Sequence, residues 1–138
     1  MNNIPNRFYR VSVKALILNE TRDKFLVCKE ENGIWELPGG GLDWGKKPQE
    51  ELVREVAEEM GLKVTRVADD PSYFIADQAI DGTIWFVNVV YETEVEHLDF
   101  TASDECVDIM FVDKTNLGDI KPFPSVVKLV DMFDPGKH

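Results

Sequence analysis

Gly40–Leu62 reads GGLDWGKKPQEELVREVAEEMGL, a glycine-containing loop followed by an acidic segment. The acidic part, residues 48–60, is made mostly of residues that favour helices. Pro48 suits the first helical position, because its missing N–H would be unpaired there in any case. Gly61 suits the residue that ends a helix in the left-handed conformation. The stretch therefore predicts a helix over residues 48–60.

The predicted helix has two chemically different faces, since successive side chains rotate by about 100°. One arc is apolar and is expected to face the core; it holds Leu52, Val53, Val56, Ala57 and Met60. The other arc is acidic, with Arg54 at its border; it holds Glu51, Glu55, Glu58 and Glu59. Like charges at these spacings destabilise a helix by about 0.2–0.5 kcal/mol per pair. Because hard cations take oxygen ligands, the acidic arc predicts a divalent-cation site, with a merely solvated face as the alternative.

The rest of the chain alternates strand and turn signals. Strand-like segments cover residues 10–18, 24–30, 34–37, 62–75, 83–91 and 106–112, and a second helical spacing covers residues 125–133. We expect the first two segments to form a hairpin. With 138 residues and no linker or internal repeat, the chain is expected to be a single α/β domain over residues 1–138.

Charge and composition exclude some classes of function. The chain carries 26 Asp and Glu against 15 Lys and Arg, a formal net charge of −11, which argues against binding a nucleic acid strand. No apolar run approaches the roughly 20 residues of a membrane span. Cys28 and Cys106 lie in apolar runs and are expected in the core. With no signal-like apolar segment at the N-terminus, we expect a cytoplasmic protein.

The combined motif resembles the signature of the Nudix hydrolases. That signature is a glycine, five residues, Glu, seven residues, then Arg-Glu-aliphatic-x-Glu-Glu-x-Gly-aliphatic, and residues 40–62 match every defined position except one. The preceding WELPGG, residues 35–40, is similar to the usual lead-in of the family. The resemblance implies the Nudix-type α/β/α sandwich around a mixed β-sheet.

The resemblance also implies roles for individual residues. Nudix enzymes use Mg²⁺ or Mn²⁺ to hydrolyse a nucleoside diphosphate linked to another group by water attack at phosphorus. Carried over, the metal ligands are Glu55, Glu58, Glu59 and the carbonyl of Gly39. Arg54 would orient the glutamates through a salt bridge. Which glutamate acts as the general base varies within the family, and Glu58 is one candidate.

A carboxylate outside the motif often completes such sites. Ser103–Glu105 precedes the last predicted strand, and we favour Glu105 over Asp104 as a catalytic residue. The alternative is that these residues form an ordinary turn leading into a strand.

Lys46 stands where the family has its first glutamate, and Lys47 follows where a good N-cap residue would be expected. The missing glutamate would support the loop, pair with Arg54 or tune a second metal. Lys46 is instead a candidate to contact a substrate phosphate. We expect activity to be retained but altered.

Further substrate contacts are less sharply indicated. Trp44 lies in the motif loop and is the preferred aromatic candidate. Tyr73, Phe74 and Trp85 also offer stacking surfaces, although aromatic residues in strands usually belong to the core. Arg10, Ser12 and Lys14 share one face of the first strand, which either reaches substrate or is simply solvated.

The sequence therefore predicts a Mg²⁺-dependent pyrophosphohydrolase acting on a small nucleotide: a nucleoside triphosphate, a nucleoside diphosphate sugar or ADP-ribose. The first rival is a catalytically impaired Nudix-fold module that binds or senses a nucleotide. It is supported by Lys46, which replaces the first glutamate of the motif. The second is an acidic scaffold whose glutamates are only solvated. No membrane partner is expected, and exposed strand edges would allow a homodimer.

Overall fold

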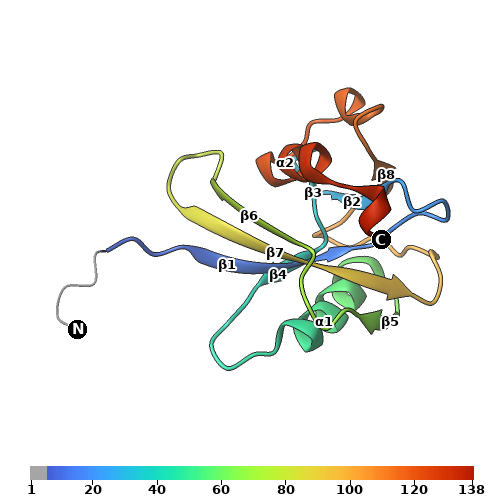
Figure 1. Ribbon diagram of the computed structural model, residues 1–138, viewed down its shortest axis with the longest axis horizontal. Coiled ribbons are helices and arrows are strands. Elements are labelled where there is room, and N and C mark those ends of the chain that lie inside the picture. The colour runs from blue at the N-terminus through green and yellow to red at the C-terminus, as the bar shows by residue number, and fades with distance from the viewer. Residues whose placement is uncertain (1–5) are drawn as a thin grey trace.

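The computed structural model describes residues 6–138, so the predicted absence of a signal segment falls largely outside the described residues. The described part contains eight strands, two α-helices and two short 3₁₀ helices (Figure 1). The strands are β1 (Arg10–Leu16), β2 (Phe25–Lys29), β3 (Trp35–Glu36), β4 (Gly39–Gly41), β5 (Val64–Val67), β6 (Tyr73–Gln78), β7 (Trp85–Val95) and β8 (Asp108–Val112). The helices are α1 (Pro48–Met60), α2 (Pro124–Met132), η1 (Leu117–Asp119) and η2 (Pro135–Lys137).

The strands form two sheets. The larger has the order β4-β1-β7-β5, with β6 also paired to β7, and the smaller has the order β3-β2-β8. β1 runs parallel to β7, and its other neighbour β4 is antiparallel, so the larger sheet is mixed. The predicted hairpin forms only at its turn, where Leu18 and Phe25 make an isolated bridge. Beyond the turn, β1 and β2 diverge into different sheets.

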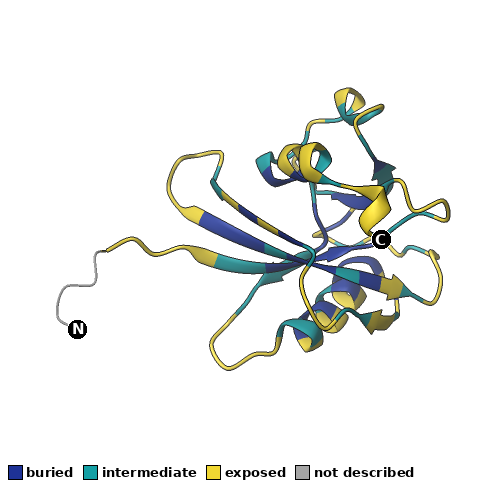
Figure 2. Ribbon diagram, viewed as in Figure 1, coloured by how far each residue is buried: buried dark blue, intermediate teal, exposed yellow. Residues whose placement is uncertain are grey.

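The two helices lie on opposite sides of the strands (Figure 1), which confirms the predicted α/β/α sandwich. One core cluster packs Leu52, Val56 and Met60 of α1 against β1 and its neighbours. The other packs Val126 and Leu129 of α2 against the opposite side. The buried segments accordingly converge where the sheets meet (Figure 2).

The helix α1 has the predicted bounds, and Gly61 ends it in the left-handed conformation with φ of 66°. The prediction of its faces was partly wrong: Val53 and Ala57 are exposed, whereas Glu51 and Glu59 are buried. The apolar stripe is narrower than a helical wheel indicates. The buried glutamates flank it because β4 and the ion pairs of Arg54 cover them, as described below.

Both cysteines are buried free thiols, as the sequence predicted. Within residues 6–138, neither helix combines the length and the hydropathy needed to cross a bilayer.

Candidate metal centre

Three glutamates from two distant parts of the chain converge beside α1. Glu55 and Glu59 project from the helix, and Glu105 comes from the loop that leads into β8. One carboxylate oxygen of each lies within 4.8 Å of the others. The structure thus brings together two of the predicted ligands and the predicted carboxylate from outside the motif.

The glycines of β4 make this approach possible. Gly39 has φ of 136°, and a Cβ there would lie 2.0 Å from the carbonyl oxygen of Val13. A Cβ on Gly40 would lie 2.7 Å from a carboxylate oxygen of Glu55. The Gly39 N–H donates to Glu59 Oε1 at 3.0 Å. Only residues without side chains let β4 lie this close to both β1 and α1.

Glu59 is the most constrained member of the cluster, with 6% of its surface exposed. Burial raises the pKa of Glu59 to about 8, and the neighbouring Glu55 and Glu105 raise it further, while Lys14 and the Gly39 N–H oppose the shift. Without a metal, Glu59 therefore keeps its proton more readily than an ordinary carboxyl group. A divalent cation would supply the missing positive charge, so the donor set fits a hard metal ion.

Arg54 organises the acidic arc through three ion pairs. Its guanidinium donates to Glu51 at 2.6 Å, to Glu55 at 2.8 Å and to Glu58 at 2.9 Å. These carboxylates raise the pKa of Arg54, with Glu51 contributing most. The arginine therefore already has three carboxylate partners within its own helix.

Glu58, the other predicted ligand, lies on the solvent side of this arrangement. Its side chain is 56% exposed and faces Arg54. The structure does not place Glu58 in the three-glutamate cluster, so its role as a ligand stays a prediction.

The predicted substrate contacts lie away from the cluster. In the β1–β4 register Gly39 is opposite Lys14, whereas Gly41 is opposite Ser12, so β4 leads away from the glutamates towards the start of β1. The loop that follows β4 carries Trp44 and Lys46, both exposed. Arg10 lies beside this loop, where its guanidinium donates to Leu42 O and to Asp43 Oδ1, each at 3.3 Å.

The other aromatic candidates are also remote from the cluster. Tyr73 is buried and its hydroxyl bonds to His138 Nε2 at 2.8 Å. Phe74 and Trp85 are exposed on β6 and at the start of β7. None of the three lines the cavity beside the glutamates.

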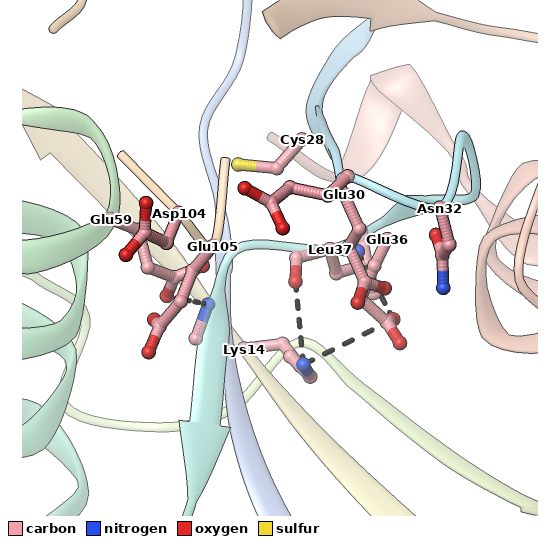
Figure 3. A pocket seen from close by; sticks show the side chains of 11 residues that line it. Lys14, Cys28, Glu30, Asn32, Glu36, Leu37, Glu59, Asp104 and Glu105 are labelled. Carbon is pink, nitrogen blue, oxygen red and sulfur yellow. Dashed lines mark hydrogen bonds and ion pairs between the residues drawn. The ribbon is translucent and has the colours of Figure 1, made fainter. Parts of the chain in front are cut away.

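That cavity has a volume of about 530 Å³, and Glu59 and Glu105 form part of its wall (Figure 3). Lys14, which with Arg10 and Ser12 was predicted either to reach substrate or to be solvated, is the exception: it is buried in the cavity wall and bonds to Leu37 O at 3.3 Å. Glu36 also lines the cavity, and no sequence pattern indicated this, because the residue belongs to a strand of only two residues.

The sandwich and the cluster of carboxylates beside a polar cavity together narrow the class of protein. Comparison with known families identifies the class further: the model of the NUDIX domain matches residues 8–128. The chain therefore belongs to the Nudix family.

Known relatives agree with this assignment. The chain is 30% identical to the nucleoside triphosphatase NudI of an Enterobacter species over 106 residues, covering 67% of this chain and 75% of that protein. It is 38% identical over 56 residues to a MutT-like protein of Streptomyces ambofaciens, covering 41% of this chain and 36% of that protein. For the first curated relatives it matches, the aligned part spans less than half of their length.

A solved structure supports the fold. The MutT protein of Methanosarcina mazei superposes with a TM-score of 0.78 at 23% identity, covering 97% of this chain and 99% of that one. At this identity the likeness concerns the fold alone.

Proposed function

We propose that this chain is a Mg²⁺- or Mn²⁺-dependent pyrophosphohydrolase that cleaves a nucleoside diphosphate linked to another group. The observation that carries the proposal is the convergence of Glu55, Glu59 and Glu105 at the edge of a 530 Å³ cavity. The nucleoside triphosphatase name of the Enterobacter relative supports small nucleotides as the substrate class.

In this proposal the metal is held by Glu55, Glu59 and Glu105, with Glu58 and the Gly39 carbonyl as further candidate ligands. When bound, a divalent cation neutralises pyrophosphate charge and lowers the pKa of a water molecule. Arg54 keeps the glutamates of the helix in register through its ion pairs. We assign acceptance of the proton from the attacking water to the Glu105 oxygen that does not hold the metal, because Glu105 lines the cavity whereas Glu58 faces Arg54.

The test is a phosphate-release screen with Mg²⁺ and with Mn²⁺. The substrates are nucleoside triphosphates, nucleoside diphosphate sugars, ADP-ribose and dinucleoside polyphosphates. We expect turnover of at least one of these groups, abolished in Glu59→Gln. Tight nucleotide binding with no turnover anywhere would reject the hydrolase and support the rival binding module.

One observation favours the rival binding module: Lys46 replaces the first glutamate of the motif and is exposed on its loop. The Lys46→Glu variant distinguishes the working hydrolase from the binding module. If the natural protein is a working enzyme, the variant changes activity modestly and unevenly across substrates. A gain of several orders of magnitude on every substrate would identify the natural protein as an impaired enzyme.

A further inference from the structure

The cavity beside the metal centre has two ends (Figure 3). Glu59, Asp104 and Glu105 lie at one end, Glu36 lies at the other, and the Glu30 carboxylate lies between them. Lys14 lies between the two ends. A substrate whose pyrophosphate lies at the first end can place one of its attached groups at the second. The lining of the second end therefore bears on what that group is.

The wall of this cavity offers no stacking surface for a nucleobase. Its lining includes six carboxylates and one cation, and none of the lining residues is aromatic. The apolar residues in the wall, Cys28 and Leu37, are only 2% and 1% exposed, so they present almost no apolar surface to a ligand. Nucleobases are normally held by stacking on aromatic or apolar faces.

The polar groups at the second end are fixed by the fold. Lys14 Nζ donates to Leu37 O at 3.3 Å and lies 4.0 Å from Glu36 Oε1. Glu36 Oε1 accepts from Ser125 Oγ at 2.8 Å, which ties it to the first turn of α2, and from the Leu37 N–H at 3.1 Å. Since an ammonium has three N–H donors, Lys14 retains donor capacity towards the cavity. The second end thus presents one donor cation among carboxylate acceptors.

We propose that the second end binds the hydroxyl-rich group of a nucleoside diphosphate sugar. In this arrangement Glu30 and Glu36 accept hydrogen bonds from sugar hydroxyls, and Lys14 donates to a sugar oxygen. Sugar hydroxyls are both donors and acceptors, so they match a wall that mixes carboxylates with one ammonium. A cationic head group would also be attracted, because the carboxylates of the wall outnumber its single ammonium, so it is the rival occupant that the first test includes. The inference rests on the proposed function and narrows its substrate class.

The first test compares substrates that share a base, using the unaltered protein with Mg²⁺. ADP-ribose is paired with ATP, UDP-glucose is paired with UTP, and CDP-choline represents the cationic alternative. We expect kcat/KM to be at least about tenfold higher for the sugar member of at least one pair. Equal or higher values for ATP and UTP, or the highest value for CDP-choline, would overturn the sugar subsite and leave the proposed function standing. If none of the five is hydrolysed and the full screen is also negative, the proposed function itself fails.

The second test asks whether these residues determine selectivity or only structure. Glu36→Gln and Lys14→Met are expected to lower the ratio of the kcat/KM values for ADP-ribose and ATP by about tenfold, mainly through KM for ADP-ribose. Glu20→Gln, an exposed substitution away from the cavity, serves as the control. A purely structural role would lower both kcat/KM values equally and leave the ratio unchanged, which would contradict the proposal. Glu30→Gln, outside the Lys14–Glu36 pair, is the substitute if either variant fails to fold.

Discussion

The glutamates of α1 fall into two groups that differ in what neutralises them. Glu51 and Glu58 are each paired with the Arg54 guanidinium. Glu59 is buried at the edge of the same arc that faces β4, where it receives a backbone N–H and lies near two further carboxylates. Glu55 belongs to both groups, because it contacts Arg54 and also joins the cluster. The same residue type on one helix thus serves two purposes, and the neighbouring charges decide which.

The difference shows why an acidic helix alone is weak support for a metal site. The arginine-paired glutamates form a charge network that is complete without a metal. In the cluster of Glu55, Glu59 and Glu105, burial and the two neighbouring carboxylates raise the pKa of Glu59, and this is the imbalance that a cation would correct. Substitutions in the two groups should therefore have different consequences.

The largest expected effect follows from removing the charge of Glu59. Glu59→Gln keeps the shape of the side chain but removes a proposed anionic ligand, and the cation that it would help to hold is worth several kcal/mol of transition-state stabilisation. We expect kcat to fall by about 10³-fold or more, while Glu50→Gln in the exposed first turn of α1 stays close to the natural protein. Steady-state phosphate release measures both. Comparable losses in the two variants would remove the distinction between the groups.

Arg54→Gln tests the paired group and should have an intermediate effect. It leaves the buried Glu51 without its cation and frees the glutamates that Arg54 orients. We expect kcat/KM to fall by about 10–100-fold, as is typical when the partner of a metal ligand is lost, with a lower melting temperature. Kinetics and thermal melts check these outcomes. A loss as large as that of Glu59→Gln would mean that Arg54 acts directly in the reaction.

The pH dependence of stability should separate the groups without any substrate. The folded-state pKa of Glu59 is about 8, against an ordinary value of 4.5. Between these values the folded protein keeps a proton that the unfolded chain has released, so this residue lowers stability as pH rises and adds no further slope above about pH 8. Urea unfolding of the metal-free protein at pH 5, 6.5 and 8 should show a steeper decline than in Glu59→Gln. Parallel declines would show that Glu59 is ionised in the metal-free fold.

The smallest effect concerns the start of α1, outside both groups. Lys47 occupies the N-cap position with extended backbone angles but makes no capping bond. Lys47→Thr would accept a backbone N–H and, with Glu50 three residues later, complete a capping box. We expect a gain of about 1 kcal/mol in the free energy of unfolding with kcat unchanged. A variant that melts lower than the natural protein would contradict this reading of the helix start.

The sequence predicted the parts of the site that local rules determine. The bounds of α1, its terminal Gly61 and the acidic arc all follow from residue type and spacing along one helix. Glu105 was predicted as a site residue only through the family resemblance. No local pattern connects it to Glu55 and Glu59, which lie about fifty positions earlier. Its place beside Glu59 depends on how the β8 entry loop packs against the helix.

Other features were beyond sequence reasoning for specific physical reasons. Glu51 can be buried because Arg54 pairs with it, and Glu59 because the Gly39 N–H of β4 bonds to it. A helical wheel shows neither of these contacts. Lys14 shares a strand face with Arg10, yet the structure sends one to the cavity and the other to the loop after β4. The two side chains diverge because β1 is exposed where it begins, at Arg10, and is buried from Val13 onward.

The most direct measurement of the central claim is calorimetric titration of Mn²⁺ into the metal-free protein at pH 7.5, with Glu59→Gln and Glu50→Gln measured alongside. If Glu55, Glu59 and Glu105 form a metal centre, the natural protein and Glu50→Gln bind Mn²⁺ alike, and Glu59→Gln binds at least about tenfold more weakly. Equal affinity in all three proteins, or binding in none of them, would contradict the account.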